Sequence, residues 1–349
     1  MWRQSCIARD QYTNYKLISV LLPVKNGGNT LFAALESLQE QSYSDFECII
    51  INDHSNDNAC ETISKQFDNR FKVINSHSAG IVAALNTGLK ASSKPLIARM
   101  DADDISLNTR FEQQVAFLKI NKAVDFCGSK IEYFSDSKTI DQGLKLYQDW
   151  INAQETHQQI TQNMFVECAI PHPSFMIRRS LFEKIGPYQD NGWAEDYDLM
   201  LRAYIHKARF GKPKDILLKW RDHHQRLSRN DQRYQKHAFI NAKAYYFSRS
   251  PIYQTAKETK QKIIIWGAGK TGKMLFKQLQ THEVRISAFV DISKKLIGSH
   301  IQNVLIHDAM TFDYENHLII IAVGSRGIRQ KIEDHLKHQT KQIDIVAMT

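Results

Sequence analysis

The fold of this chain is constrained most by short, almost continuously apolar segments that alternate with helical ones. Residues 16–24 and 46–51 are nearly all apolar, as strands buried on both faces of a parallel sheet are. Residues 30–41 and 80–91 carry apolar side chains at the spacing of a helix. Strand and helix alternate four times before Asp101. The pattern predicts an α/β fold with a mainly parallel sheet flanked by helices.

A cluster of carboxylates follows the fourth predicted strand. Asp101, Asp103 and Asp104 lie within four residues of one another and precede a predicted helix. Open α/β sheets bind ligands at the carboxyl ends of their strands, so these acids are expected at a binding edge. Hard oxygen ligands of this kind suit Mg²⁺ or Mn²⁺, which in turn bind phosphate oxygens. A solvated turn that caps the next helix explains the acids equally well.

The alternation becomes less regular after residue 118 and restarts at residue 262. Strand-like segments occur at residues 124–128, 131–134, 173–177 and 216–220, and helical ones at 151–164, 179–185 and 196–206. Residues 231–249 predict a basic amphipathic helix, and residues 250–260 a linker. We therefore expect a first domain at residues 1–228, a helix and linker at 229–260, and a smaller α/β domain at 261–349.

Positive charge is concentrated in one segment. The net charge is +9, and residues 221–262 hold ten Lys or Arg against three acids, or +7. The segment contains no nucleic-acid-binding motif, so we expect no nucleic acid partner. An anionic membrane surface, a diphosphate substrate and a solvated basic face are all compatible with this charge.

Cysteine usage and hydropathy indicate the compartment. Five cysteines are scattered without a Cys-x-x-Cys pair, which predicts reduced thiols rather than disulfides or a zinc site. No apolar run approaches the roughly 20 residues that a membrane span needs. We expect a cytoplasmic protein, with peripheral contact at the inner face of the membrane through residues 221–262 as one interpretation of the basic segment.

A glycine motif opens the second domain. Gly267, Gly269 and Gly272 follow a predicted strand and begin a predicted helix, and Asp291 ends the next strand, 19 residues past Gly272. This order fits a fingerprint for NAD or another nucleotide. Only about 90 residues remain, roughly one mononucleotide-binding half. A regulatory or docking module without a nucleotide is therefore an equal alternative.

Five motifs of the first domain occur in a characteristic order. They are residues 23–26, residues 52–57, Gly80 with Asn86 and Gly88, residues 99–104, and residues 194–199 preceded by His172-Pro173-Ser174. In this order and spacing, residues 16–228 resemble the family 2 nucleotide-sugar glycosyltransferases, inverting enzymes with the A-type fold. The resemblance implies a mixed, mainly parallel sheet flanked by helices. The second domain resembles the Rossmann-like modules attached to some sugar-modifying enzymes.

The resemblance implies a site for a nucleotide-sugar donor. Asp103 would hold Mn²⁺ or Mg²⁺, and Asp101 would face the ribose and the water shell of the metal. Asp53 would recognise the base of a UDP-linked donor, although Asn52 stands where many relatives have a second Asp. The other donor-binding residues that it implies are Pro23, Lys25, Asn26, Asn86 and Arg99.

The same resemblance implies an acceptor site at Glu195-Asp196. Asp196 matches the catalytic base, which takes the proton of the acceptor hydroxyl, and Glu195 lies beside it. One base without an enzyme nucleophile implies a single displacement with inversion. Capping of a helix N-terminus would also explain the two acids. His223 matches a histidine that approaches the metal or the diphosphate, with His224 as the alternative.

These features predict an enzyme that moves a sugar from a nucleotide-sugar donor to a glycan or lipid-linked glycan acceptor in cell-surface polysaccharide synthesis. Two other function classes are weaker. An NAD-dependent sugar-nucleotide oxidoreductase or epimerase needs more than the second domain, which has no Tyr-x-x-x-Lys pair after its glycine motif. A non-catalytic nucleotide-sugar sensor has no need for both the acidic motif and Glu195-Asp196.

Overall fold

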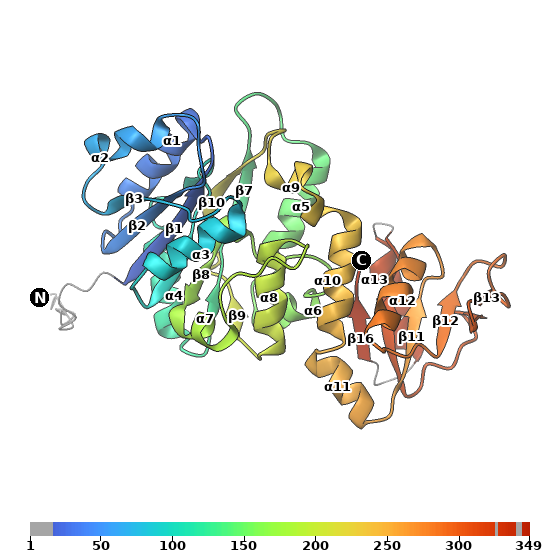
Figure 1. The fold of residues 1–349 in the computed structure, drawn as a ribbon. Helices are drawn as coiled ribbons and strands as arrows, with labels where there is room; N and C mark the ends of the chain where they lie inside the picture. The colour runs from blue at the N-terminus through green and yellow to red at the C-terminus, as the bar shows by residue number, and fades with distance from the viewer. Residues whose placement is uncertain (1–16, 325–326, 340–343) are drawn as a thin grey trace, which may run out of the picture.

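A computed structural model describes residues 17–324, 327–339 and 344–349 of the chain. The chain forms two lobes of unequal size (Figure 1). The larger lobe holds the N-terminal part and the smaller lobe the C-terminal part. Two helices, α10 (Lys236–Phe247) and α11 (Pro251–Glu258), lie between the lobes. The predicted fold class, an α/β fold with a second, smaller α/β domain, is confirmed.

The larger lobe is built on a seven-stranded sheet. Its strands are β1 (Ile18–Val24), β2 (Phe46–Asn52), β3 (Phe71–Asn75), β4 (Leu96–Arg99), β6 (Phe126–Cys127), β8 (Met176–Arg178) and β9 (Phe210–Gly211). The order is β3-β2-β1-β4-β8-β6-β9. The first four strands in this order are parallel, whereas β8 runs antiparallel to β4 and β6. The sheet is therefore mixed and mainly parallel, as predicted.

Side chains of β1 alternate between two apolar cores, one on each face of the sheet. Val20 and Leu22 are fully buried in the core that also contains α1 (Gly28–Gln39) and α4 (Arg110–Ile120). Leu21 is fully buried in the core that contains α3 (Ile81–Ala91) and α8 (Glu195–Ile205). Other helical segments of the larger lobe are η1 (Ala59–Thr62), α2 (Ile63–Gln66), η2 (His172–Ser174) and α7 (Arg179–Ile185).

A three-stranded sheet lies beside the main one. It contains β5 (Ile105–Ser106), β10 (Ile216–Arg221) and β7 (Lys130–Phe134), with β10 in the middle.

The helix predicted at residues 151–164 is wrong, because the structure has α5 (Gln142–Asn152) and α6 (His157–Gln162) instead. Thr156 explains the break: it forms a reciprocal capping box with Gln159, so a new helix starts there.

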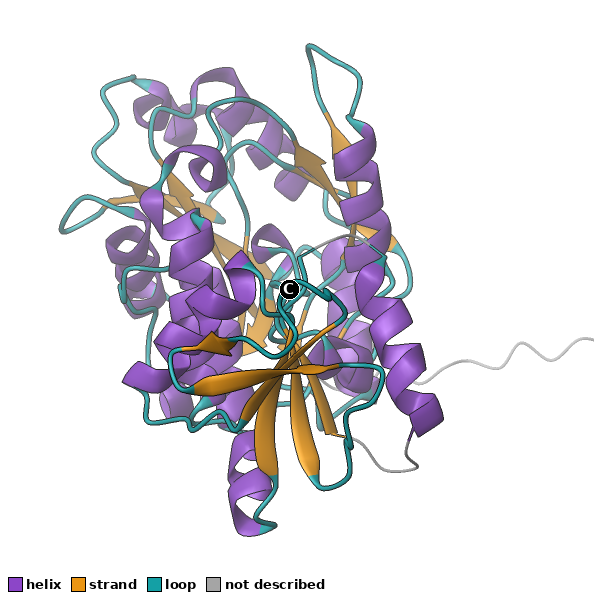
Figure 2. Ribbon diagram, turned by 90° about the vertical axis from the view of Figure 1, so that its right-hand side faces the viewer, coloured by secondary structure: helices purple, strands orange, loops and turns teal. Residues whose placement is uncertain are grey.

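The smaller lobe is a second parallel sheet. Figure 2 looks onto this lobe, whose strands fan out with the twist expected of an open sheet. Its strands are β11 (Lys262–Trp266), β12 (Ala288–Asp291), β13 (His300–Ile301), β14 (Val304–Asp308), β15 (His317–Ile321) and β16 (Asp344–Ala347), and its helices α12 (Lys270–Thr281) and α13 (Ile328–Gln339). The order of the parallel strands, β14-β12-β11-β15-β16, is that of a Rossmann-like fold.

The connection between the lobes is helical and packed. It contains α9 (Leu227–Asn230), η3 (Gln232–Tyr234), α10 and α11. The linker predicted at residues 250–260 is therefore wrong: the Ser250 hydroxyl caps α11, and Pro251 occupies its first turn. Tyr246 and Phe247 of α10 are buried in an apolar cluster that also includes Leu21 and Leu275. One continuous core thus joins the two lobes.

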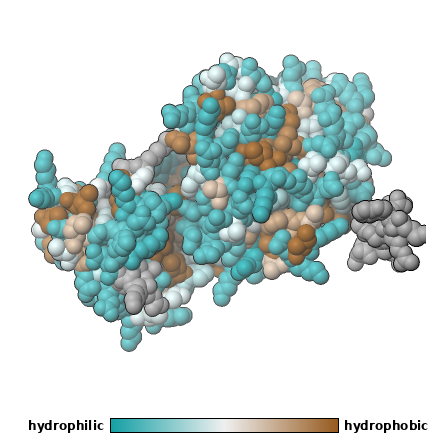
Figure 3. Space-filling model, turned by 180° about the vertical axis from the view of Figure 1, so that it is seen from behind, coloured by the Kyte–Doolittle hydropathy of each residue, from teal (hydrophilic) through white to brown (hydrophobic). Residues whose placement is uncertain are grey.

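Among the described residues, no helix is both long and apolar enough to cross a membrane. The back of the molecule is mainly hydrophilic, with separate apolar patches (Figure 3). The four cysteines within the described residues, Cys48, Cys60, Cys127 and Cys168, are buried and free.

Candidate active site

Three carboxylates converge just after β4. Asp101, Asp103 and Asp104 each place an oxygen within 4.8 Å of the others. Asp101 and Asp103 are half-buried, whereas Asp104 is 1% exposed. Asp104 Oδ2 is buried and has no hydrogen-bond partner among the described residues. Burial raises the pKa of Asp104 well above its ordinary value, and the charges of Asp101 and Asp103 raise it further. The cluster therefore fits a divalent cation with oxygen ligands.

The end of β10 and the loop after it close over these acids. The Arg221 backbone N–H donates to Asp104 Oδ1 at 2.8 Å, and Arg221 Nε donates to the Asp103 carbonyl at 2.5 Å. His223 Nε2 lies 2.7 Å from Asp103 Oδ2. His224 is exposed. Of the two histidines, the structure brings His223 to the predicted metal ligand Asp103, and the role of His223 toward a metal stays a prediction.

The predicted nucleoside pocket lies at the ends of β1 and β2. Both oxygens of Asp53 accept the Gly80 N–H, at 2.9 and 3.1 Å. Asn26 Oδ1 accepts a backbone N–H of the loop after β2 at 2.8 Å, so the two loops hold each other. Pro23 is buried in β1 and Lys25 is exposed after it. The structure brings these residues to one edge, and their contacts with a nucleoside stay predictions.

Arg99 and Asn86, two predicted donor-binding residues, contact protein groups in the structure. Arg99 is 4% exposed, and its guanidinium pairs with Asp101. Asn86 exchanges two hydrogen bonds with the backbone of Tyr188, donating at 2.9 Å and accepting at 3.0 Å. Arg99 therefore orients Asp101, and Asn86 holds the loop before α8 against α3. Direct contact of either residue with a sugar donor stays a prediction.

Asp196 lies on the wall of a cavity of about 310 Å³. Arg226 and Trp220 share this wall, and the backbone N–H of Arg221, the residue after Trp220, donates to Asp104, so the cavity adjoins the acidic cluster. The Arg226 guanidinium also stacks 4.5 Å from the ring centroid of Trp220. The other wall residues with rings are Tyr133, Tyr147, His172, Tyr234 and Phe239. A concave site with aromatic walls and a few polar groups suits a small ligand such as a sugar.

The two carboxylates of the acidic pair have different surroundings. Glu195 is 1% exposed, and both of its oxygens accept the Tyr234 hydroxyl at 2.9 Å. His172 Nδ1 lies 3.5 Å from Glu195 Oε1. Asp196 is half-buried and lines the cavity. Glu195 is therefore enclosed by protein, whereas Asp196 is placed to meet a ligand.

These surroundings shift the pKa values of the two carboxyl groups in opposite directions. Burial raises the pKa of Asp196 to about 8, and the neighbouring Glu195 charge contributes to the rise. Burial also opposes ionisation of Glu195, but hydrogen bonds from His172 and Tyr234 hold the Glu195 pKa below its ordinary value. An acid whose pKa lies near neutral pH is suited to general acid–base catalysis. The raised pKa of Asp196 and its position on the cavity wall therefore favour Asp196 over Glu195 as a proton acceptor.

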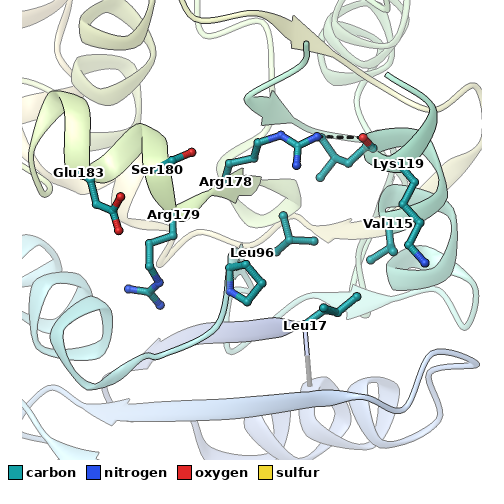
Figure 4. Close-up of a pocket in the computed structure, with 10 residues that line it drawn as sticks. Leu17, Leu96, Val115, Lys119, Arg178, Arg179, Ser180 and Glu183 are labelled. Carbon is teal, nitrogen blue, oxygen red and sulfur yellow. Dashed lines mark hydrogen bonds between the residues drawn. The ribbon is translucent and has the colours of Figure 1, made fainter. Parts of the chain in front are cut away.

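A larger cavity, of about 420 Å³, lies at the opposite end of the strands. Leu17 and Pro95, which precede β1 and β4, line it together with Arg178 and Arg179 (Figure 4). Both arginines donate to backbone carbonyls, Arg178 to that of Leu118 at 2.9 Å among others. Ligands of open α/β sheets bind at the carboxyl ends of the strands, so this cavity is not the candidate active site.

The turn between β11 and α12 explains two of the three glycines in the motif of the smaller lobe. Gly267 has a φ of 112°, and a Cβ on Gly272 would lie 1.9 Å from the Gly267 carbonyl oxygen. A Cβ on Gly269 would meet nothing within 4 Å. Asp291 Oδ2 accepts the Ala268 N–H at 2.8 Å. The turn itself therefore requires the first and third glycines, and the open space at Gly269 is where a phosphate would approach.

A comparison with protein families identifies the domain that carries the acidic cluster. Residues 19–186 match the model described as Glycosyl transferase family 2. Over these residues the chain is similar to glycosyl transferase family 2. The family 2 match includes the acidic cluster, whereas Asp196, His223 and Tyr234 follow it in the sequence. Residues 259–345 match a second model, described as C2185-like, N-terminal.

Curated relatives of this chain are named as glycosyltransferases. The bifunctional glycosyltransferase pgtA of Dictyostelium discoideum is 31% identical over 276 residues, which are 66% of this chain and 36% of that protein. This chain thus spans about a third of the length of pgtA. The O-antigen biosynthesis glycosyltransferase WbnJ of Escherichia coli is 27% identical over 242 residues, which are 67% of this chain and 91% of WbnJ.

Solved structures share the fold of the glycosyltransferase. The crystal structure of S. aureus TarS in complex with UDP-GlcNAc has a TM-score of 0.56 at 16% identity, covering 76% of this chain and 72% of that one. At this level of identity the likeness shows the fold alone. With the order of the sheet, it confirms the predicted A-type fold. NAD binding at the glycine motif gains no support from these relatives and stays a prediction.

Several residues of the candidate site were not predicted. Asp104 belongs to the acidic run that the sequence pointed out, but nothing in the sequence marked it as the buried member. His172 precedes a recognised motif, and its contact with Glu195 has no local signal. Arg226 and Tyr234 are surrounded by other basic and aromatic residues, and only the folding of residues 216–247 onto the cavity reveals them.

Proposed function

We propose that the chain is an inverting glycosyltransferase that moves a sugar from a UDP-linked donor to a hydroxyl of a glycan or lipid-linked glycan in cell-surface polysaccharide synthesis. The observation that carries this proposal is the position of Asp196 in a cavity beside three converging carboxylates. Two E. coli relatives support it by name: WbnJ in O-antigen biosynthesis, and WfgD, a UDP-Glc:alpha-D-GlcNAc-diphosphoundecaprenol beta-1,3-glucosyltransferase, 29% identical over 125 residues.

In this proposal Asp196 is the general base. The acceptor hydroxyl binds in the cavity and gives its proton to Asp196 as its oxygen attacks the anomeric carbon of the donor sugar. The bond from that carbon to the diphosphate breaks in the same step. Because the nucleophile is the acceptor itself, one displacement occurs and the anomeric configuration inverts. Glu195 lies beside Asp196 and does not touch the acceptor, since protein groups enclose the Glu195 carboxylate.

A divalent cation, Mn²⁺ or Mg²⁺, fits the acidic cluster. Asp101, Asp103 and His223 would hold it, close to the buried and unpaired oxygen of Asp104. When bound, the cation supplies a Lewis acid that offsets the charge of the departing diphosphate. Arg99 fixes Asp101 in place through its ion pair. Asp53, Pro23, Lys25 and Asn26 form the nucleoside end of the donor site in this proposal.

Binding and turnover of nucleotide sugars test the proposal directly. Melting temperature is measured with a panel of nucleotide sugars, with and without Mn²⁺, and release of the nucleoside diphosphate is then followed with candidate acceptors. We expect a UDP-sugar to raise the melting temperature in the presence of Mn²⁺, and UDP release to require an acceptor or water. If no nucleotide sugar binds under either condition, the proposal is contradicted. The family 2 match supports a glycosyltransferase over an oxidoreductase or an epimerase.

We also propose that this cytoplasmic enzyme contacts an anionic membrane surface through residues 221–262. The aromatic residues Tyr246 and Phe247 are buried, so such contact rests on exposed cations. These include Arg229, Lys236, Lys257 and Lys260. Sedimentation with vesicles of phosphatidylglycerol, compared with phosphatidylcholine, tests this point. Equal binding to the two kinds of vesicle, or none, contradicts it.

A further inference from the structure

The segment that joins the lobes reaches the catalytic pair. We call residues 232–247 the connecting segment. Its Tyr234 follows the family 2 match in the sequence and donates its hydroxyl to both oxygens of Glu195. Its Phe239 lines the same cavity as Asp196. The connecting segment therefore supplies part of the wall on which the acceptor is expected to bind.

The smaller lobe holds the connecting segment at several points. Lys236 Nζ donates to the Thr271 hydroxyl, at the start of α12, at 2.7 Å. Lys243 is 6% exposed, and its ammonium donates at 2.9 Å both to the Val166 carbonyl in the larger lobe and to the Met348 carbonyl after β16. The ring of Tyr245 packs edge-on against His282, with centroids 5.5 Å apart. Helix α10 is thus fixed between the two lobes.

Glu195 depends on this segment for its hydrogen bonds. A carboxylate that is 1% exposed must find its partners within the protein, because water does not reach it. The Tyr234 hydroxyl at 2.9 Å is within ordinary hydrogen-bond distance of both oxygens, whereas His172 at 3.5 Å is at the limit. A shift of the connecting segment would therefore leave a buried charge poorly paired, directly beside the proposed base.

We propose that the smaller lobe completes the acceptor site of the glycosyltransferase, by fixing the connecting segment so that Tyr234 holds Glu195 beside Asp196. Tyr234 is then a positioning residue, since its hydroxyl is used on Glu195. The inference rests on the proposed function for its catalytic consequence. It assigns the C-terminal Rossmann-like lobe a role that requires no bound nucleotide.

Tyr234→Phe in the full-length chain tests the first half of the inference. Loss of a hydrogen bond to a buried charge is expected to lower kcat/KM for the acceptor about tenfold to a hundredfold. KM for the sugar donor should stay within about twofold, because the donor site lies on other elements. Tyr253→Phe makes the same change on α11 and should alter neither constant. Acceptor kinetics of Tyr234→Phe equal to those of the control overturn the inference.

Lys243→Met tests whether the smaller lobe acts through Tyr234. Amide hydrogen exchange over residues 232–240 should become faster, and kcat/KM for the acceptor should fall. In the double variant with Tyr234→Phe, the fall should be no larger than the larger single effect, because both changes remove the same contact. If the two substitutions lower kcat/KM by factors that multiply in the double variant, the proposed route from the smaller lobe through Tyr234 is overturned. If Lys243→Met does not fold, Thr271→Val, which removes the partner of Lys236, enters the same cycle.

Hydrogen exchange separates failure of this inference from failure of the proposed function. Unchanged protection of residues 232–240 in Lys243→Met or Thr271→Val overturns the inference, even if the wild type transfers no sugar. Faster exchange there, together with an active wild type and multiplied kinetic effects, rejects the catalytic link and leaves the glycosyltransferase function intact.

Discussion

His223 Nε2 lies 2.7 Å from Asp103 Oδ2, although 120 residues separate them in the chain. The pairing of β10 with β5 brings them together, since Lys219 lies opposite Ile105 in this antiparallel pair. The late loop therefore reaches the acidic cluster through the small three-stranded sheet and not through the main one. A cation site that used both Asp103 and His223 would be complete only when both parts of the domain are folded.

Removal of the proposed metal ligand should stop transfer without unfolding the protein. Asp103→Ala is expected to lower activity by more than about a hundredfold, because even changes to groups that only hydrogen-bond to the ligands of a metal cost about ten- to hundredfold. The fold should survive, since Asp103 is half-buried. Mn²⁺ affinity by calorimetry and the melting curve are the measurements. Asp190→Ala, an exposed acid before α8, is the control. Full wild-type activity in EDTA would contradict metal dependence.

Transfer should increase with pH because the proposed base must lose its proton. Burial and the Glu195 charge raise the pKa of Asp196 to about 8. The rate under single-turnover conditions should rise from about pH 6, reach half of its maximum near pH 8 and level off above about pH 9, as expected for a base of this pKa. A rate that is flat or falls across this range would assign the proton to another group.

The same raised pKa predicts the pH dependence of stability. Asp196 binds its proton more tightly in the folded chain, where its pKa is about 8, than at its ordinary value of 3.8. Its contribution to stability is therefore fully present below the ordinary value and is lost as pH rises through the folded value. The free energy of unfolding of the wild type, minus that of Asp196→Asn, should fall over this range in denaturant titrations. A difference that rises with pH would contradict the assigned shift.

The glycine motif offers a matched pair of substitutions. Gly272→Ala should destabilise the smaller lobe by about 1–3 kcal/mol or more, because overpacking against fixed backbone costs this much. Gly269→Ala should leave stability nearly unchanged, since its Cβ would enter open space. Thermal or denaturant unfolding of both variants makes the comparison. Equal effects would show that the turn is looser than its close contacts indicate. A nucleotide that binds the wild type and not Gly269→Val would support nucleotide binding there.

The elements of the fold that were predicted are those with strong periodicity. The buried strands β1, β2 and β4 and the helices α3 and α8 follow from apolar runs and helical spacing. The carboxyl ends of β2 and β4 fix where Asp53 and Asp101 lie. The segment 142–162 was predicted poorly, because its helices have mixed composition and their boundary depends on one capping box at Thr156. The polar sequence of residues 250–260 predicts a linker, but Ser250 and Pro251 form the start of helix α11.

The candidate site was predictable as a set of motifs and not as a set of contacts. The acidic run and Glu195-Asp196 are local in sequence. The residue types of the acidic run indicate a cation site, whereas the role of Glu195-Asp196 follows from the family resemblance. The contact of Tyr234 with Glu195 spans 39 residues and depends on how α10 packs between the lobes. The exposure that distinguishes Asp196 from Glu195 is likewise a property of tertiary packing. No periodicity or spacing encodes either fact.

The most direct test of the central claim is single-turnover transfer by Asp196→Asn. The substitution keeps the shape of the side chain and removes the proton acceptor. Transfer should fall by about 10²–10⁴, the usual contribution of a positioned general base. Binding of donor and Mn²⁺ should persist, because those groups lie on other strands, and Glu195→Gln should cost less. A near wild-type rate for Asp196→Asn would contradict the assignment of Asp196 as the base, and an inactive Glu195→Gln beside it would exchange the two roles.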